Sequence, residues 1–211
     1  MHPFIDVNTY LLTCSEGIPE ALRPKNCQSC LAQVRLHKHG KFFRLVFTLE
    51  AELRIPIYRF FCPLCEHSCS FLPDFIEPHQ QVALDVQEEI VESQQGESLS
   101  TVAALTEHLP GGFYSEKTLW RWVRKWNDRL HAIEPQLWEW VFRHDAHIQL
   151  PRHRHGWTAW RQIWRQLQLT SDRWPPFLWK VRQLFQSLSL TERVENPTKP
   201  VHGIRASLPS Q

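Results

Sequence analysis

Two Cys-x-x-Cys pairs constrain the fold of this chain more than any other feature of it. They lie at residues 27–30 and 62–65, and 31 residues separate them. A turn of this type brings two sulfurs to one side of a metal ion, and two such turns across a hairpin complete a closed tetrahedral zinc site. We therefore predict one structural Zn2+ with four thiolate ligands: Cys27, Cys30, Cys62 and Cys65. A closed site stabilises a fold and has no open position for catalysis.

The sequence allows other roles for the cysteines. The pairs could be buried thiols, or redox motifs of the thioredoxin kind, although no βαβ pattern surrounds either pair. Five further side chains are alternative metal ligands: Cys14, Cys69, His37, His39 and His67. We expect none of them to bind metal, because a buried free cysteine behaves as a small apolar residue and the histidines near a turn should face solvent. In a reducing compartment, six cysteines are not expected to form structural disulfides.

The segment between the two pairs predicts β structure. Residues 31–61 are rich in Val, Ile, Phe and Thr, and they are interrupted at His39-Gly40 and near residues 50–52. Polar and apolar side chains alternate with period two, which fits two or three antiparallel strands. Because Gly40 can supply the positive φ of a hairpin turn, we expect a turn there. The two cysteine pairs would then lie at the ends of a small β-meander.

The rest of the chain predicts helices. An amphipathic pattern with acids on one face covers residues 82–95. A short helix is expected over residues 100–109, with Ser98 or Ser100 as its cap, and a third helix should begin at Ser115. Further helical segments are predicted after Pro135, over residues 136–144, 158–169 and 175–188. Tryptophans recur there at helical spacing between arginines, and we interpret them as core, with stacking on nucleic acid as the alternative.

The predicted third helix has an apolar stripe and a cationic stripe. The apolar stripe consists of Leu119, Val123, Trp126 and Leu130, and the cationic stripe of Lys117, Arg121, Arg124 and Lys125. With the preceding short helix and the connection PGGFY, it fits a helix-turn-helix, whose second helix enters the major groove of DNA. We therefore predict that the cationic stripe binds DNA; an ordinary amphipathic helix with a solvated basic face is the alternative. Trp120 and Trp122 are predicted to be packing residues.

Charge is distributed unevenly along the chain, although the net charge is only +2. Residues 71–110 contain eight acids and no Lys or Arg, whereas residues 111–211 contain sixteen Lys or Arg and eight acids. The two segments therefore carry formal charges of −8 and +8. A basic segment can bind polyanions, and on charge alone the acidic segment could also dock on it. Solvated charge on ordinary helices is the simpler interpretation.

These patterns predict an α+β protein with four parts. A small antiparallel β zinc ribbon with an N-terminal arm occupies residues 1–78, and a helix-turn-helix module occupies residues 79–132. A Trp- and Arg-rich helical part follows over residues 133–190, and a flexible tail over residues 191–211. We recognise no signal-peptide pattern, and no run approaches the roughly 18 apolar residues of a membrane span. We therefore expect a cytoplasmic protein without a membrane partner.

Four stretches of the sequence together resemble a known family. They are CQSC at residues 27–30, HKHG at 37–40, RFFCPLCEHSCSFLPDFIEP at 59–78 and KTLWRWVRKW at 117–126. The combination is similar to an uncharacterised bacterial family of small zinc-ribbon plus helix-turn-helix proteins, related to the N-terminal DNA-end-binding part of insertion-sequence transposases. The resemblance covers about residues 27–130. The chain departs from it at Leu31 and Glu66, where such knuckles usually have glycine.

The resemblance implies a function for both motifs. The four cysteines of the two pairs would be the zinc ligands, and residues 117–125 would be the helix that reads double-stranded DNA. A transposase also needs a catalytic domain, usually three acids on an RNase H-like sheet that hold two divalent metals. The few acids after residue 130 are surrounded by predicted helical structure, and about 80 residues without strands cannot build that fold, so we expect no enzymatic activity. We expect an accessory or regulatory DNA-binding protein associated with transposition or mobile DNA, with a transposase or another mobile-element protein as a further partner. The alternative is a protein-interaction adaptor that uses the ribbon and the acidic helix.

Overall fold

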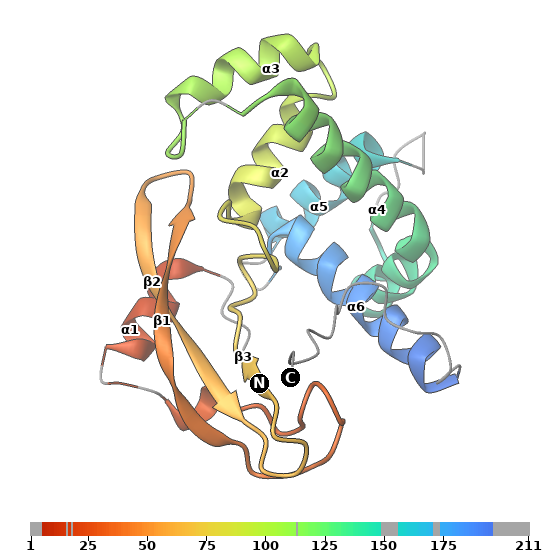
Figure 1. The fold of residues 1–211 in the computed structure, drawn as a ribbon. Coiled ribbons are helices and arrows are strands. Elements are labelled where there is room, and N and C mark those ends of the chain that lie inside the picture. The colour runs from red at the N-terminus through yellow and green to blue at the C-terminus, as the bar shows by residue number, and fades with distance from the viewer. Residues whose placement is uncertain are drawn as a thin grey trace, which may run out of the picture.

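The fold is a three-stranded antiparallel sheet followed by a group of helices (Figure 1). A computed structural model of the chain describes residues 6–15, 17, 19–112, 114–148, 156–170 and 174–195. The elements before the helical part are α1 (Val7–Cys14), the short 3-10 helix η1 (Glu20–Leu22), β1 (His37–Phe47), β2 (Glu52–Phe61) and β3 (Ser68–Ser70). The helical part consists of α2 (Leu84–Ser93), α3 (Leu99–Leu105), the 3-10 helix η2 (Thr106–His108), α4 (Glu116–His144), α5 (Trp157–Thr170) and α6 (Phe177–Glu195). The predicted α+β class is confirmed.

The sheet has the order β1-β2-β3, so β1 is an edge strand. The turn between β1 and β2 lies at the position predicted near residues 50–52, where the Thr48 backbone N–H donates to the carbonyl of Ala51 at 3.0 Å. The hydroxyl of Thr48 also accepts hydrogen bonds from the backbone N–H groups of Glu50 and Ala51. These bonds fix the register of the hairpin, because turn geometry sets strand pairing.

The prediction of a hairpin turn at Gly40 is wrong. Gly40 lies inside β1, where the pairing with β2 shifts register between Lys38 and Gly40. Its φ of 111° is the positive value that the sequence predicted, but the residue forms a β-bulge and the strand continues past it. A single glycine serves a bulge as well as it serves a turn, so its presence alone does not locate a chain reversal.

The hairpin packs against α1 and pairs with the segment before α2. On one face, α1 contributes Tyr10, and the hydroxyl of Tyr58 in β2 donates to the carbonyl of Gly17 at 3.0 Å. At the turn end of the hairpin, the segment before α2 pairs with β1: the Phe47 N–H donates to the Gln81 carbonyl at 2.8 Å. The sheet therefore has its own core, in which Val46, Ile55, Ile57 and Phe60 are fully buried.

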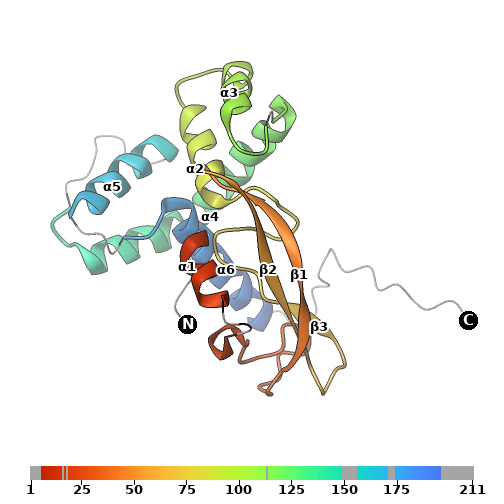
Figure 2. The same cartoon turned by 90° about the vertical axis from the view of Figure 1, so that its left-hand side faces the viewer.

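A second core holds the helical part together. In Figure 2, α5 lies on the side of this part that faces away from the β hairpin. The largest side chains of this core are Trp126, Trp160 and Trp164, all completely buried. Tryptophans at helical spacing are therefore core residues, as expected. Of the arginines in the predicted Trp- and Arg-rich part, Arg152, Arg154 and Arg173 lie outside the described residues.

α4 differs from the prediction, because it continues through Pro135. The predicted boundary between residues 132 and 133 thus falls inside a helix of 29 residues. Proline removes one backbone hydrogen bond, but the buried stripe continues across it: Leu130, Ile133, Leu137 and Val141 all face the core. Burial of this stripe offsets the lost hydrogen bond and the strain of the proline ring.

Ion pairs join the acidic segment to the basic half of the chain. Glu77, which is buried, pairs with Lys125 and Arg129 of α4. Glu88 and Glu92 of α2 pair with Arg161 of α5. Docking of one segment on the other is therefore observed, and it holds elements of the fold together.

The last helix, α6, extends into the segment that the sequence predicted as a tail. Residues 191–195 belong to α6, and the remainder of the predicted tail, residues 196–211, lies outside the described residues. Among the helices that the structure describes, none is long and apolar enough to cross a membrane.

Candidate metal centre and cationic helix

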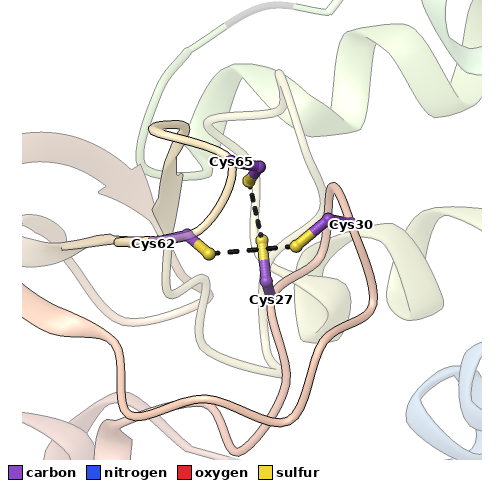
Figure 3. A group of neighbouring side chains, drawn as sticks. All are labelled: Cys27, Cys30, Cys62 and Cys65. Atoms are coloured by element: carbon purple, nitrogen blue, oxygen red, sulfur yellow. Dashed lines mark hydrogen bonds between the residues drawn. The ribbon is translucent and has the colours of Figure 1, made fainter.

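The two cysteine pairs meet in one cluster. Cys27 and Cys30 come from the loop before β1, and Cys62 and Cys65 from the turn between β2 and β3 (Figure 3). All four sulfur atoms lie within 4.8 Å of one another. Sγ of Cys27 is 3.6 Å from Sγ of Cys65, and Sγ of Cys30 is 3.8 Å from Sγ of Cys62. The predicted convergence of these side chains is confirmed, and the cluster can hold a metal ion.

The two turns of the cluster have the same backbone geometry. In the first, the Leu31 N–H donates to the Cys27 carbonyl at 2.9 Å, and in the second the Glu66 N–H donates to the Cys62 carbonyl at 3.0 Å. Leu31 and Glu66 have φ of 60° and 59°, which is the left-handed region that favours glycine. At the two positions where the chain departs from the family pattern, Leu31 and Glu66 therefore adopt the backbone conformation of glycine. This conformation is strained for a residue that has a Cβ atom.

The electrostatics of the cluster favour a cation. Backbone N–H groups of Cys30 and Ser29 point at the Cys27 sulfur and lower the pKa of this thiol to about 6. The backbone of His67 favours the thiolate of Cys65 in the same way, but burial and the three neighbouring sulfurs outweigh it and raise the pKa of Cys65 to about 12. Four thiolates at this separation repel one another strongly, and a divalent cation between them removes that repulsion.

The alternative ligands lie elsewhere. In the part of the chain that the structure describes, the cluster consists of the four paired cysteines. Cys14 and Cys69 are buried in the core of the sheet, where burial raises the pKa of both thiols. His37 and His39 are exposed on β1, and Nδ1 of His67 lies 2.7 Å from the Cys65 carbonyl.

Three of the four predicted DNA-binding side chains share the outer surface of α4. Lys117, Arg121 and Arg124 are exposed along its first turns. Arg124 forms a weak, exposed ion pair with Asp128 at 3.8 Å. Trp120, predicted to pack, is 48% exposed, and its ring lies 5.3 Å from the Arg124 guanidinium carbon. The surface therefore combines three cations with one exposed aromatic ring that the sequence interpretation missed.

Lys125 differs from the other three in position. Its ammonium group pairs with Glu77 and donates to the side-chain oxygen of Gln87 at 2.9 Å. The same Gln87 oxygen accepts a hydrogen bond from the indole N–H of Trp126 at 3.0 Å. The apolar stripe also differs from the prediction, because Trp122 is buried where Val123 was expected and Val123 is half-buried. Compared with the predicted orientation, α4 is therefore rotated slightly about its axis. This rotation turns the Lys125 side chain toward the interior.

The connection between α3 and α4 is held in place by side chains. Ser98 and Ser115 cap the two helices by accepting hydrogen bonds from the backbone N–H groups of Thr101 and Thr118. Within the connection, the Tyr114 N–H donates to the hydroxyl of Thr106 at 3.1 Å. These contacts fix the connection between α3 and the first turn of α4.

The fold and the cluster define a two-part α+β protein with a four-cysteine cluster that can hold a metal ion. A family model described as a domain of unknown function (DUF6431) matches residues 27–122. The matched region begins at the first cysteine of the cluster and ends within the first turns of α4. Neither the comparison with curated proteins nor the comparison with solved structures gives a match.

Proposed function

We propose that the protein is a zinc-stabilised protein that binds double-stranded DNA through the first turns of α4. The observation that carries the proposal is that some cations of the helical part form ion pairs within the fold, whereas others face solvent. Lys125, Arg129 and Arg161 are engaged in ion pairs with buried or half-buried acids. The cations on the first turns of α4 face solvent, where phosphates and guanine edges of a major groove are accessible to them.

Zinc is the metal that best fits the cluster. Zn2+ binds four thiolates tetrahedrally at about 2.3 Å, and a tetrahedron with such bonds has edges of about 3.8 Å. The sulfur separations of 3.6 and 3.8 Å agree with that edge length. Because all four ligands are thiolates, a soft or borderline cation is preferred over magnesium or calcium. The zinc would hold the loop before β1 against the turn after β2.

The resemblance to the DNA-end-binding part of transposases supports a role in transposition or mobile DNA. In this role the chain binds DNA as an accessory or regulatory protein. Another protein supplies the chemistry of strand transfer. The adaptor alternative loses part of its surface, because Glu88 and Glu92 of the acidic helix α2 are engaged with Arg161.

The test combines metal analysis with duplex binding at several salt concentrations. We expect about one zinc per chain. Each phosphate contact contributes about −0.9 to the slope of log affinity against log salt. The triple variant Lys117→Ala, Arg121→Ala, Arg124→Ala should therefore weaken duplex binding and flatten this slope by roughly two to three.

Arg143→Ala is the matched control, because Arg143 is an exposed cation at the far end of the same helix. Its duplex affinity should equal that of the wild type. A triple variant that binds duplex DNA with unchanged affinity and salt slope would refute the role of α4.

A further inference from the structure

An exposed phenylalanine on the edge strand lies between two cations. The side chain of Phe43 in β1 is 53% exposed. The ammonium nitrogen of Lys41 lies 5.5 Å from the centre of its ring, and the guanidinium carbon of Arg54 lies 5.9 Å from it. Both separations are within the range of cation–π interactions.

The register of the hairpin explains this arrangement. Lys41 precedes Phe43 by two residues, so both side chains project from the same face of β1. Arg54 is opposite Leu45, two residues beyond Phe43 on that face. The two cations thus flank the ring from its two sides along the strand.

The surroundings of the ring are cationic. Residues 31–49 contain four Lys or Arg and no Asp or Glu. Among the described residues, neither Lys41 nor Arg54 has a carboxylate within ion-pair distance. Residues 37–43 of β1 are all exposed, and among the described residues the pairing on the free edge of β1 is at Phe47, beyond this stretch. This face of the hairpin therefore presents an aromatic ring and two positive charges without an ion-pair partner together.

We propose that Phe43, Lys41 and Arg54 form a binding site for an unpaired nucleotide of single-stranded nucleic acid. A base stacks on an exposed aromatic ring, and flanking cations bind the phosphates on either side of it. In a duplex, the bases are already stacked on one another, so this ring selects an unpaired base. The site deepens the proposed function, since it rests on nucleic acid as the partner, but it uses residues remote in sequence from those of α4.

A protein strand added to the edge of β1 is the competing occupant. The bulge at Gly40 interrupts the ladder that such a strand would extend, and the row of cations opposes a neutral partner. The charge pattern therefore favours a polyanion at this edge.

The experiment measures binding of the full chain to a labelled oligothymidylate of about 15 nucleotides and to a duplex of equal length. Phe43→Ala should weaken binding of the single strand by about fivefold or more, because stacking contributes at this level. Its duplex affinity should be unchanged. Phe42→Ala is the control, since Phe42 is 45% exposed on the opposite face of the same strand.

Several outcomes would overturn the site. One is a Phe43→Ala variant that binds the single strand like the wild type and like Phe42→Ala. Another is a loss of self-association, measured by sedimentation, without a change in single-strand binding, which would make this edge a protein interface. A chain that binds single strands but no duplex would retain this site and refute the role proposed for α4, so the two failures are distinguishable.

Discussion

Replacement of Glu77 by glutamine should destabilise the protein by about 2–3 kcal/mol. The Glu77 side chain is 7% exposed, and its two oxygens pair separately with Lys125 and Arg129, whose side chains are 25% and 23% exposed. Removing one partner of a fully buried pair costs about 3–5 kcal/mol, whereas an exposed pair contributes about 0–1 kcal/mol. Partial exposure of the two cations, and the bond that Lys125 keeps to Gln87, place the expected cost between these limits.

The same carboxyl makes the stability depend on pH. Burial opposes ionisation of Glu77, but Lys125 and Arg129 outweigh it, so the pKa of Glu77 in the folded protein lies below its usual value. The unfolded chain therefore takes up this proton first as the pH falls. The contribution of Glu77 is complete above about pH 5 and is lost as the pH falls through the folded pKa. Glu77→Gln should remove this part of the acid sensitivity.

Urea unfolding followed by tryptophan fluorescence measures both effects. Tryptophan fluorescence is a suitable probe of unfolding, because Trp126, Trp160 and Trp164 are fully buried in the helical core and become exposed when it unfolds. Glu139→Gln is the matched control, since Glu139 pairs with Arg143 at an exposed position of α4. It should cost less than about 0.5 kcal/mol. The reasoning is refuted if Glu77→Gln costs no more than this control, or if its stability falls with pH as steeply as that of the wild type.

Three further predictions test the cluster and the backbone. Cys62→Ser should lose the zinc, whereas Cys69→Ser should retain it, as measured by metal analysis of the purified variants. Leu31→Gly should raise the free energy of unfolding by about 0.5–1 kcal/mol, because glycine relieves the left-handed strain at a cost in chain entropy; a loss of stability would contradict this. Gly111→Ala should be less stable than Gly112→Ala by about 1–3 kcal/mol in urea. Both glycines have positive φ, but only a Cβ at Gly111 would lie 2.7 Å from the ring of Phe47, so equal stabilities would exclude this close contact.

Local patterns were sufficient to predict the four-cysteine cluster and the order of most elements. Two short turns of the same spacing carry the cysteines, and the soft thiolate chemistry depends on residue type alone. Helical periodicity likewise located α2, α5 and α6, because an amphipathic stripe needs only a neighbouring surface on which to pack. Period and spacing therefore determined the class of fold and the candidate ligands.

Contacts between distant residues decided the rest. Whether Gly40 forms a turn or a bulge depends on its pairing with β2, and whether α4 ends at Pro135 depends on the core beneath it. Lys125 and Arg121 are equivalent by sequence, yet Lys125 meets Glu77, 48 residues away, while Arg121 faces solvent. The sequence by itself determined how many cations the helix carries. Only the tertiary structure decided which of them face solvent, because a charge is neutralised by whatever acid the fold brings within a few ångströms.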